Sequence, residues 1–272
     1  NRLSIGMQAF QEELLELLGR IHSFDEVVRS VRMAEAFGIR NINLDLIFGI
    51  PRQTPDQWKE TLLQALSLQP AHISAYGLIP EEGTPLFEDL KNGRLILPEP
   101  EEERDMYDGA IRLLAEAGLR QYEISNFAAE HAACAHNIGY WTQLPYLGLG
   151  LSAASMRVTE KSGRGFAYRR ETNPERFEDY EQMVQQKRRP EPETISFSDS
   201  RFETLMLGLR MNEGVSEQRF ESLHHIPMDQ IYGKKLRQLE AQGLMIHEND
   251  HWKMSRRGFD IHNSILVELM EA

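Results

Sequence analysis

The sequence has one cysteine, Cys134, among its 272 residues. One thiol cannot form a disulfide within the chain, nor build an all-cysteine metal site from this chain alone. The sequence also lacks any apolar run near the roughly 20 residues that a membrane-spanning helix needs. No signal-peptide pattern precedes the first expected strand. We therefore expect a cytoplasmic protein without a membrane span, made of one large domain or two ordinary ones.

Positive charge is scarce relative to negative charge. Thirty lysines and arginines stand against 42 aspartates and glutamates, which gives a net charge of -12. Because such a chain is repelled by polyanions, its charge argues against general binding to nucleic acids or anionic membranes. Internal repeats and low-complexity tracts are absent too. The 41% hydrophobic and 26% charged residues are typical of a folded globular protein.

Strand and helix signals alternate along the first half of the chain. A capping box predicts a helix that begins near Ser23, and proline at the first helical position predicts another after Thr54. A third helix is expected over residues 101–117. Strands are expected at residues 2–8, 41–51, 72–79, 120–127 and 146–156. This rhythm predicts an α/β fold with a parallel sheet. Five such strands fit part of a (β/α) barrel, whose chemistry lies at the C-terminal ends of the strands.

Two further expectations concern the strands. The apolar run at residues 41–51 is interpreted as a strand buried on both faces. The chain opens on Asn1 and enters a strand at once, so we expect it to be a C-terminal fragment of a longer protein.

The pattern changes after a charged, proline-containing segment at residues 185–193. We expect residues 1–185 to form the barrel part with its extension, 186–197 a linker, and 198–272 a small, mainly α, winged-helix-like domain. The last of these rests on helices expected at 201–210, 216–223, 229–242 and 257–270, with a hairpin around Asn249. Nine basic and eight acidic residues nearly balance between 201 and 257. A winged-helix DNA-binding regulator is therefore the least favoured function.

Three polar residues near expected strand ends are candidates for ligand binding. Asp45 lies within an otherwise apolar strand, and a buried carboxylate is costly unless it is paired. It suits either a ribose diol at a barrel mouth or a structural salt bridge. Gln8 and Arg20 are equally ambiguous, although an arginine can hold a carboxylate through two hydrogen bonds. The segment 77–85 is either a loop that closes over a ligand or a plain turn.

The stretch HAACAHNIGYW concentrates side chains of versatile chemistry. These are His131, Cys134, His136, Asn137, Tyr140 and Trp141. The histidines and the cysteine suit zinc, iron or haem iron, and the two aromatic rings suit packing on a macrocycle. The amide could orient a ligand. The alternative is a structural loop in which the polar groups bond to the backbone and the rings are buried.

Several segments together resemble a known family. NRLSIGMQAF, LLGRIH, NINLDLIFGIPRQT, HISAYGLIPEEGTPL, YEISNFA, CAHNIGYW and YLGLGLSAASM follow in this order. They resemble the radical S-adenosylmethionine family of oxygen-independent coproporphyrinogen III oxidases and their relatives. The tail from about Ser198 resembles that family's C-terminal domain. The patterns H-N-x-x-Y-W at residues 136–141 and Y-x-L-x-x-E-x-G-T at residues 76–84 point to its haem chaperone branch, HemW.

The resemblance implies a radical-SAM barrel with S-adenosylmethionine and a [4Fe-4S] cluster, in a protein that binds haem and delivers it to acceptor proteins. Membrane-associated respiratory proteins are candidate acceptors. The alternative is an oxygen-independent coproporphyrinogen III dehydrogenase that performs radical oxidative decarboxylation. The implied S-adenosylmethionine contacts are Gln8, Arg20, Asp45, Ile79 and Ala154. The implied haem contacts are Cys134, His136, Asn137, Tyr140 and Trp141.

This chain departs from the family pattern in one respect. The cluster-binding C-x3-C-x2-C loop and the Gly-Gly-Thr segment are both absent from it. We therefore expect no cluster site, no metal ligands and no catalytic residues within these 272 residues.

Overall fold

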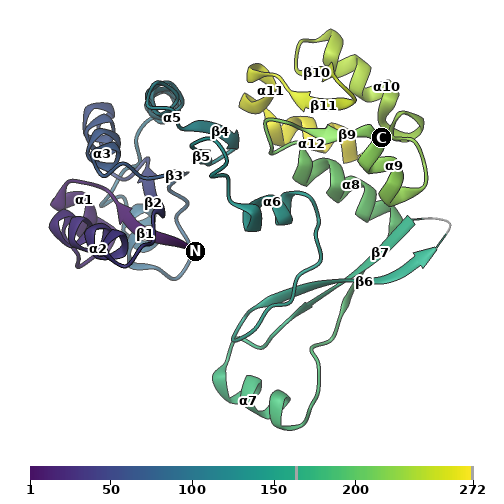
Figure 1. Cartoon of the computed structure of the whole chain (residues 1–272), viewed down its shortest axis with the longest axis horizontal. Coiled ribbons are helices and arrows are strands. Elements are labelled where there is room, and N and C mark those ends of the chain that lie inside the picture. Colours follow the sequence, from purple (N-terminus) through teal and green to yellow (C-terminus); the bar gives the residue numbers. More distant parts are fainter. Residues whose placement is uncertain (163–164, 271–272) are drawn as a thin grey trace. The chain divides into compact units, whose positions relative to one another are not determined.

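The structure is a computed structural model, and it describes residues 1–162 and 165–270. The chain divides into two compact units, Asn1–Ala133 and Cys134–Ala272 (Figure 1). Each unit is described by itself. None of the described helices is long and apolar enough to cross a membrane.

The first unit is built on a five-stranded sheet with the order β1-β2-β3-β5-β4. Its strands are β1 (Arg2–Gln8), β2 (Asn41–Phe48), β3 (His72–Gly77), β4 (Arg120–Glu123) and β5 (Asn126–Ala128). Its helices are α1 (Glu12–Leu17), α2 (Phe24–Ala36), α3 (Pro55–Ser67), α4 (Pro85–Lys91) and α5 (Pro100–Glu116). Strands β1, β2 and β3 are parallel neighbours with helices between them in the sequence, so the predicted α/β class is confirmed.

The helix starts predicted from capping signals are confirmed. Helix α2 begins after Ser23 with a capping box in which Glu26 bonds back to the cap, and α3 begins after Thr54 in the same way. Gly38 follows α2 with φ of 84°, a left-handed conformation that costs glycine little. These starts and stops depend on a few adjacent residues, which is why the sequence alone predicts them.

The prediction of one parallel strand over residues 120–127 is wrong. The chain turns at Ile124–Ser125, and β5 runs back antiparallel to both β4 and β3. The turn is held by the Glu123 carboxylate, which accepts a hydrogen bond from the Ser125 amide at 3.2 Å. A side-chain bond of this kind reverses the chain without a glycine or proline, so hydrophobic periodicity does not reveal it.

The segment 146–156 is not a fifth strand of this sheet either. It lies in the second unit, where Tyr146 and Met156 form an isolated antiparallel bridge. Gly148 sits against the backbone here, because a Cβ at that position would lie 2.1 Å from the Ala154 carbonyl oxygen. The sheet of the first unit therefore has three parallel strands, not five.

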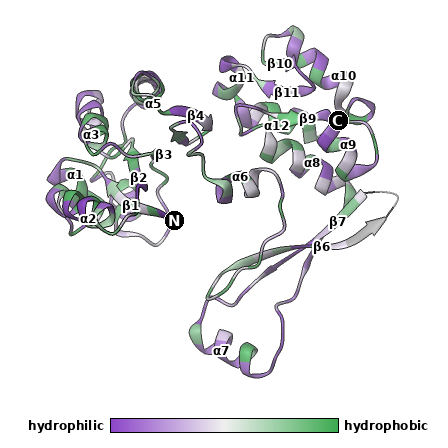
Figure 2. Ribbon diagram, viewed as in Figure 1, coloured by the Kyte–Doolittle hydropathy of each residue, from purple (hydrophilic) through white to green (hydrophobic). Residues whose placement is uncertain are grey.

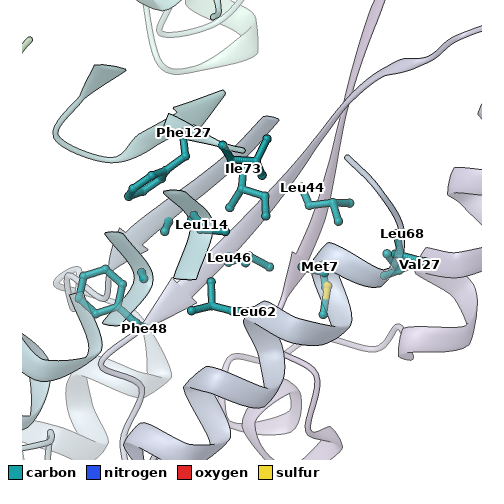
Figure 3. Packing of buried hydrophobic residues seen from close by; sticks show 14 of the residues in the cluster. Met7, Val27, Leu44, Leu46, Phe48, Leu62, Leu68, Ile73, Leu114 and Phe127 are labelled. Carbon is teal, nitrogen blue, oxygen red and sulfur yellow. The ribbon is translucent and has the colours of Figure 1, made fainter. Parts of the chain in front are cut away.

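On the face of β2 opposite the core, Asn43 is buried and Asp45 and Ile47 are half-buried, so the prediction of a strand buried on both faces is confirmed in part. Ile42, Leu44, Leu46 and Phe48 are buried in the main core against α2, α3 and α5. Figure 3 shows Leu44, Leu46 and Phe48 in one cluster with Leu62 and Leu114 from the covering helices. The residues in between, Asn43 and Asp45, belong to the opposite face of the sheet. Each of these helices carries both hydrophilic and hydrophobic residues (Figure 2).

The second unit begins with α6 (Ala135–Trp141) and a small antiparallel sheet. That sheet contains β6 (Ala154–Ser162), β7 (Gly165–Thr172) and β8 (Glu193–Ile195), and α7 (Phe177–Gln185) lies between β7 and β8 in the sequence. The predicted linker at 186–197 thus includes a strand. The domain limits at residues 185 and 198 stay a prediction.

The winged-helix-like module predicted for the tail is present. It consists of α8 (Phe197–Gly208), β9 (Val215–Ser216), α9 (Glu217–His224), α10 (Met228–Ala241), β10 (Met245–Glu248), β11 (His251–Met254), α11 (Arg256–Asp260) and α12 (His262–Met270). The hairpin β10-β11 turns at Asn249–Asp250 as predicted, and β11 also pairs with β9. The last predicted helix is two helices, because the chain leaves helical geometry at Ile261.

Candidate functional site

A hydrogen-bonded polar network occupies the face of the first sheet opposite the hydrophobic core. Asp45 accepts a hydrogen bond from the Ser4 hydroxyl at 2.7 Å and another from the Asn43 amide at 2.8 Å. Each carboxylate oxygen thus has one partner from a neighbouring side chain. An ionised carboxylate has about four acceptor positions, so Asp45 keeps capacity for two further donors, such as the hydroxyls of a diol.

The network continues through Asn43 to a buried histidine on β3. Because a carboxylate cannot donate, the amide nitrogen of Asn43 must face Asp45, which turns its oxygen toward His72 Nδ1 at 2.6 Å. His72 Nδ1 therefore carries the proton, and Nε2 accepts from the Tyr122 hydroxyl at 3.0 Å. Burial, helped by the positive charge of Arg2, lowers the pKa of His72 to about 3. The ring is neutral across the physiological range and holds the network in one tautomer.

Gln8 is directed toward the same face by a backbone irregularity. Its φ is 63°, and the β1–β2 register shifts between Gly6 and Gln8. A Cβ at Gly6 would lie only 2.6 Å from Gln8 Nε2. The Gln8 amide thus folds back over a position without a side chain, and Gly6 is itself the register partner of Asp45. The structure brings Gln8 and Asp45 to one end of the sheet.

Arg20 and Ile79 line one open groove of about 660 Å³ in the first unit. The groove is also lined by Ile47, which lies two residues beyond Asp45 on β2. Four of the five predicted S-adenosylmethionine contacts therefore belong to the first unit, two on the sheet and two on this groove. The fifth, Ala154, lies at the start of β6 in the second unit.

Helix α6 carries the predicted haem contacts and presents one histidine to the surface. His136 is exposed, and its ring lies edge-on to Tyr140 with centroids 4.8 Å apart. Tyr140 in turn lies edge-on to Tyr146, also at 4.8 Å. The spacing of four residues places His136 and Tyr140 on one helix face. An exposed imidazole with an aromatic neighbour can ligate iron and offer flat apolar surface beside it.

The remaining residues of this stretch do not form a metal site. His131 lies before the helix, with its ring 3.5 Å from the carboxylate of Glu130. Cys134 is the N-terminal cap residue of α6, and Asn137 is half-buried. Among residues 1–162 and 165–270, no three His, Cys, Asp or Glu side chains are grouped to hold a metal ion.

Two basic residues of α10 in the winged-helix module are paired with acids. Lys235 pairs with Glu268 at 3.2 Å, and Arg237 pairs with Asp229 on the same helix. Two of the three cations on α10 that could reach phosphates are therefore engaged. The structure gives no support for the DNA-binding alternative.

Comparisons with known proteins match nearly the whole chain. The Radical SAM superfamily model matches residues 1–65, and the HemN C-terminal domain model matches residues 196–261. The heme chaperone HemW of Bacillus subtilis (strain 168) is 33% identical over 97% of this chain and 68% of its own length. HemW of Escherichia coli (strain K12) is 33% identical over 98% of this chain and 67% of its own length.

This chain belongs to the HemW family. It spans about two thirds of the length of these bacterial relatives. A solved structure of coproporphyrinogen III oxidase (HemN) from Escherichia coli matches 99% of this chain and 64% of that chain, with a TM-score of 0.75 and 20% identity. That likeness shows the fold, and it confirms a radical-SAM-type α/β architecture followed by a HemN-type C-terminal domain.

Sequence reasoning missed most of the polar network around Asp45. Ser4, Asn43, His72 and Ser74 were not singled out, although Asn43 and Asp45, like His72 and Ser74, are spaced two apart on neighbouring strands. That spacing places polar groups on one sheet face. This two-residue spacing is visible in the sequence, but the apolar residues between the polar positions make the segments resemble uniformly apolar strands.

Proposed function

We propose that this chain binds haem on α6 and serves in delivering it to acceptor proteins. The observation that carries the proposal is the exposed His136 ring backed by Tyr140, within the H-N-x-x-Y-W pattern at residues 136–141. Cys134, Asn137 and Trp141 complete the proposed site. The chaperone role is supported by the name of the relatives in whose family the chain lies. We place this function in the cytoplasm.

A haem titration followed by absorbance tests the proposal. We expect saturable binding to the unmodified chain, and at least a tenfold loss of affinity in the variant His136→Ala, because the iron loses its protein ligand. His131→Ala is the matched control, since it removes another exposed histidine five residues away that lies outside α6. Cys134→Ala tests whether the thiol takes part. Equal affinity of His136→Ala and the unmodified chain would refute the assignment.

We also propose that the polar end of the first sheet holds S-adenosylmethionine. Asp45, with two acceptor positions to spare, suits the ribose hydroxyls, and the Gln8 amide suits the adenosine. Arg20 on the groove rim suits the methionine carboxylate, and Ile79 offers apolar wall. Given one electron from a reductant such as a [4Fe-4S] cluster, bound S-adenosylmethionine would supply the family's radical chemistry.

A variant of the carboxylate tests this second site. Asp45→Asn keeps the shape, removes the charge and replaces one acceptor oxygen by an NH2 donor, so fewer acceptor positions remain for the ribose hydroxyls. We expect S-adenosylmethionine to bind about tenfold more weakly by calorimetric titration. Glu35→Gln is the control, because Glu35 pairs with Arg32 on the exposed surface of α2. Unchanged binding in Asp45→Asn would refute this placement.

The residues present do not fit a [4Fe-4S] cluster. Such clusters are held by cysteine thiolates, usually four, and the 272 residues contain one cysteine.

A further inference from the structure

The C-terminal end of α6 is fastened to the winged-helix module by three consecutive residues. Trp141, Thr142 and Gln143 each contact a side chain from or just after α8 or α9. All these residues belong to the second unit. The exposed His136 lies at the other end of the same short helix.

Gln143 makes the deepest of the three contacts. Its side chain is buried and accepts a hydrogen bond from the Thr204 hydroxyl of α8. Thr204 also contacts His224 Nε2 of α9 at 2.8 Å. Gln143 has φ of 54°, a strained conformation for a residue other than glycine. Such strain persists only where the surroundings hold it, which here is the buried contact between α6, α8 and α9.

Two arginines of the module hold the neighbouring residues. The Arg210 guanidinium lies 5.4 Å from the centroid of the Trp141 ring, at a distance typical of a cation–π contact. Arg219 donates to the Thr142 carbonyl at 2.5 Å, at the helix end where a cation is favourable. Within the described part of the chain the Trp141 indole nitrogen has no hydrogen-bond partner. The ring is therefore held by packing and by Arg210.

We propose that Arg210, Thr204 and Arg219 are positioning residues that fix the orientation of α6. Each acts through its contact with one of the three residues at the end of this helix. On this basis the HemN-type C-terminal domain holds the haem-binding helix in place, and His136 and Tyr140 face the cargo from a rigid support. The inference rests on the proposed haem site, but the anchoring is measurable without haem.

Hydrogen exchange of the α6 amides, read by mass spectrometry on the full chain, tests the anchoring directly. The double variant Arg210→Ala/Arg219→Ala removes a cation–π contact and a hydrogen bond, so we expect amides 135–141 to exchange about five- to fiftyfold faster. Arg210→Lys, which keeps a cation over the ring, should restore much of the protection in the presence of Arg219. Arg237→Ala is the control, because Arg237 pairs only within α10.

Haem titration of the same variants tests the consequence. We expect the double variant to bind haem at least fivefold more weakly, while the control and the thermal midpoint of the winged-helix module stay unchanged. Unchanged exchange in α6 would overturn the anchoring. Faster exchange with unchanged haem affinity would overturn the positioning role. If the unmodified chain bound no haem, the proposed function would fail, whereas the exchange result would still decide whether α6 is anchored.

Discussion

Acid should destabilise the first unit through one buried side chain, His72. Its folded pKa is about 3, whereas the unfolded value is about 6.5. Between these two pH values the unfolded chain therefore binds a proton on His72, whereas the folded unit leaves His72 neutral. Stability from this group is fully present above the unfolded pKa and is lost as pH falls through the interval from about 6.5 to about 3.

The size of the effect follows from these two values. Linkage gives a loss of about 2 kcal/mol in the free energy of unfolding between pH 7.5 and pH 5.0. A folded pKa one unit higher would change this figure little, because His72 is still neutral at pH 5.0. The side chain is 1% exposed, so solvent screening does not reduce the estimate.

The assay compares the unmodified chain with the variant His72→Gln at both pH values. Hydrogen exchange in increasing urea, read on peptides from β2 and α3, reports unfolding of the first unit alone. Other titrating groups, including His224 in the second unit, cancel in the difference between the two proteins. We expect the pH effect to be about 2 kcal/mol smaller in His72→Gln. His131→Gln, at an exposed position, should retain the full effect.

The network around His72 also predicts a constant cost of the variant at neutral pH. A glutamine cannot satisfy both Asn43 and Tyr122 as the ring does, so about 1–3 kcal/mol should be lost at pH 7.5 as well. If the pH dependence of His72→Gln equals that of the unmodified chain, the argument from burial is refuted.

Substitution of two glycines by alanine should affect stability to different extents. In Gly6→Ala the new Cβ meets only the movable end of Gln8, so stability by urea unfolding should change by less than about 1 kcal/mol, while S-adenosylmethionine binding weakens; retained binding would contradict the proposed role of Gln8. In Gly148→Ala the Cβ meets the Ala154 carbonyl at 2.1 Å, so the second unit should lose about 1–3 kcal/mol. Gly109→Ala in α5, with open space around it, is the comparison and should be neutral or stabilising; an equal loss there would count against the steric argument.

The sequence by itself determined the features that depend on neighbouring residues. The capping boxes at Ser23 and Thr54, the hairpin turn at Asn249–Asp250 and the succession of helices in the tail all follow from contacts a few residues apart. The H-N-x-x-Y-W pattern indicated the family by resemblance, and its six positions are consecutive in the sequence. A short stretch of sequence contains all the residues that such local features need.

Only the tertiary structure decided how distant residues meet. It turned residues 120–127 into a hairpin, and it placed residues 146–156 outside the parallel sheet. It also joined Asn43, Asp45 and His72 into one network, and seated Gln143 against Thr204, 61 residues away. These arrangements depend on burial and on hydrogen bonds between separate elements. Asn43 and Asp45 are two residues apart, but the other partners come from separate segments, so local patterns could not predict those contacts.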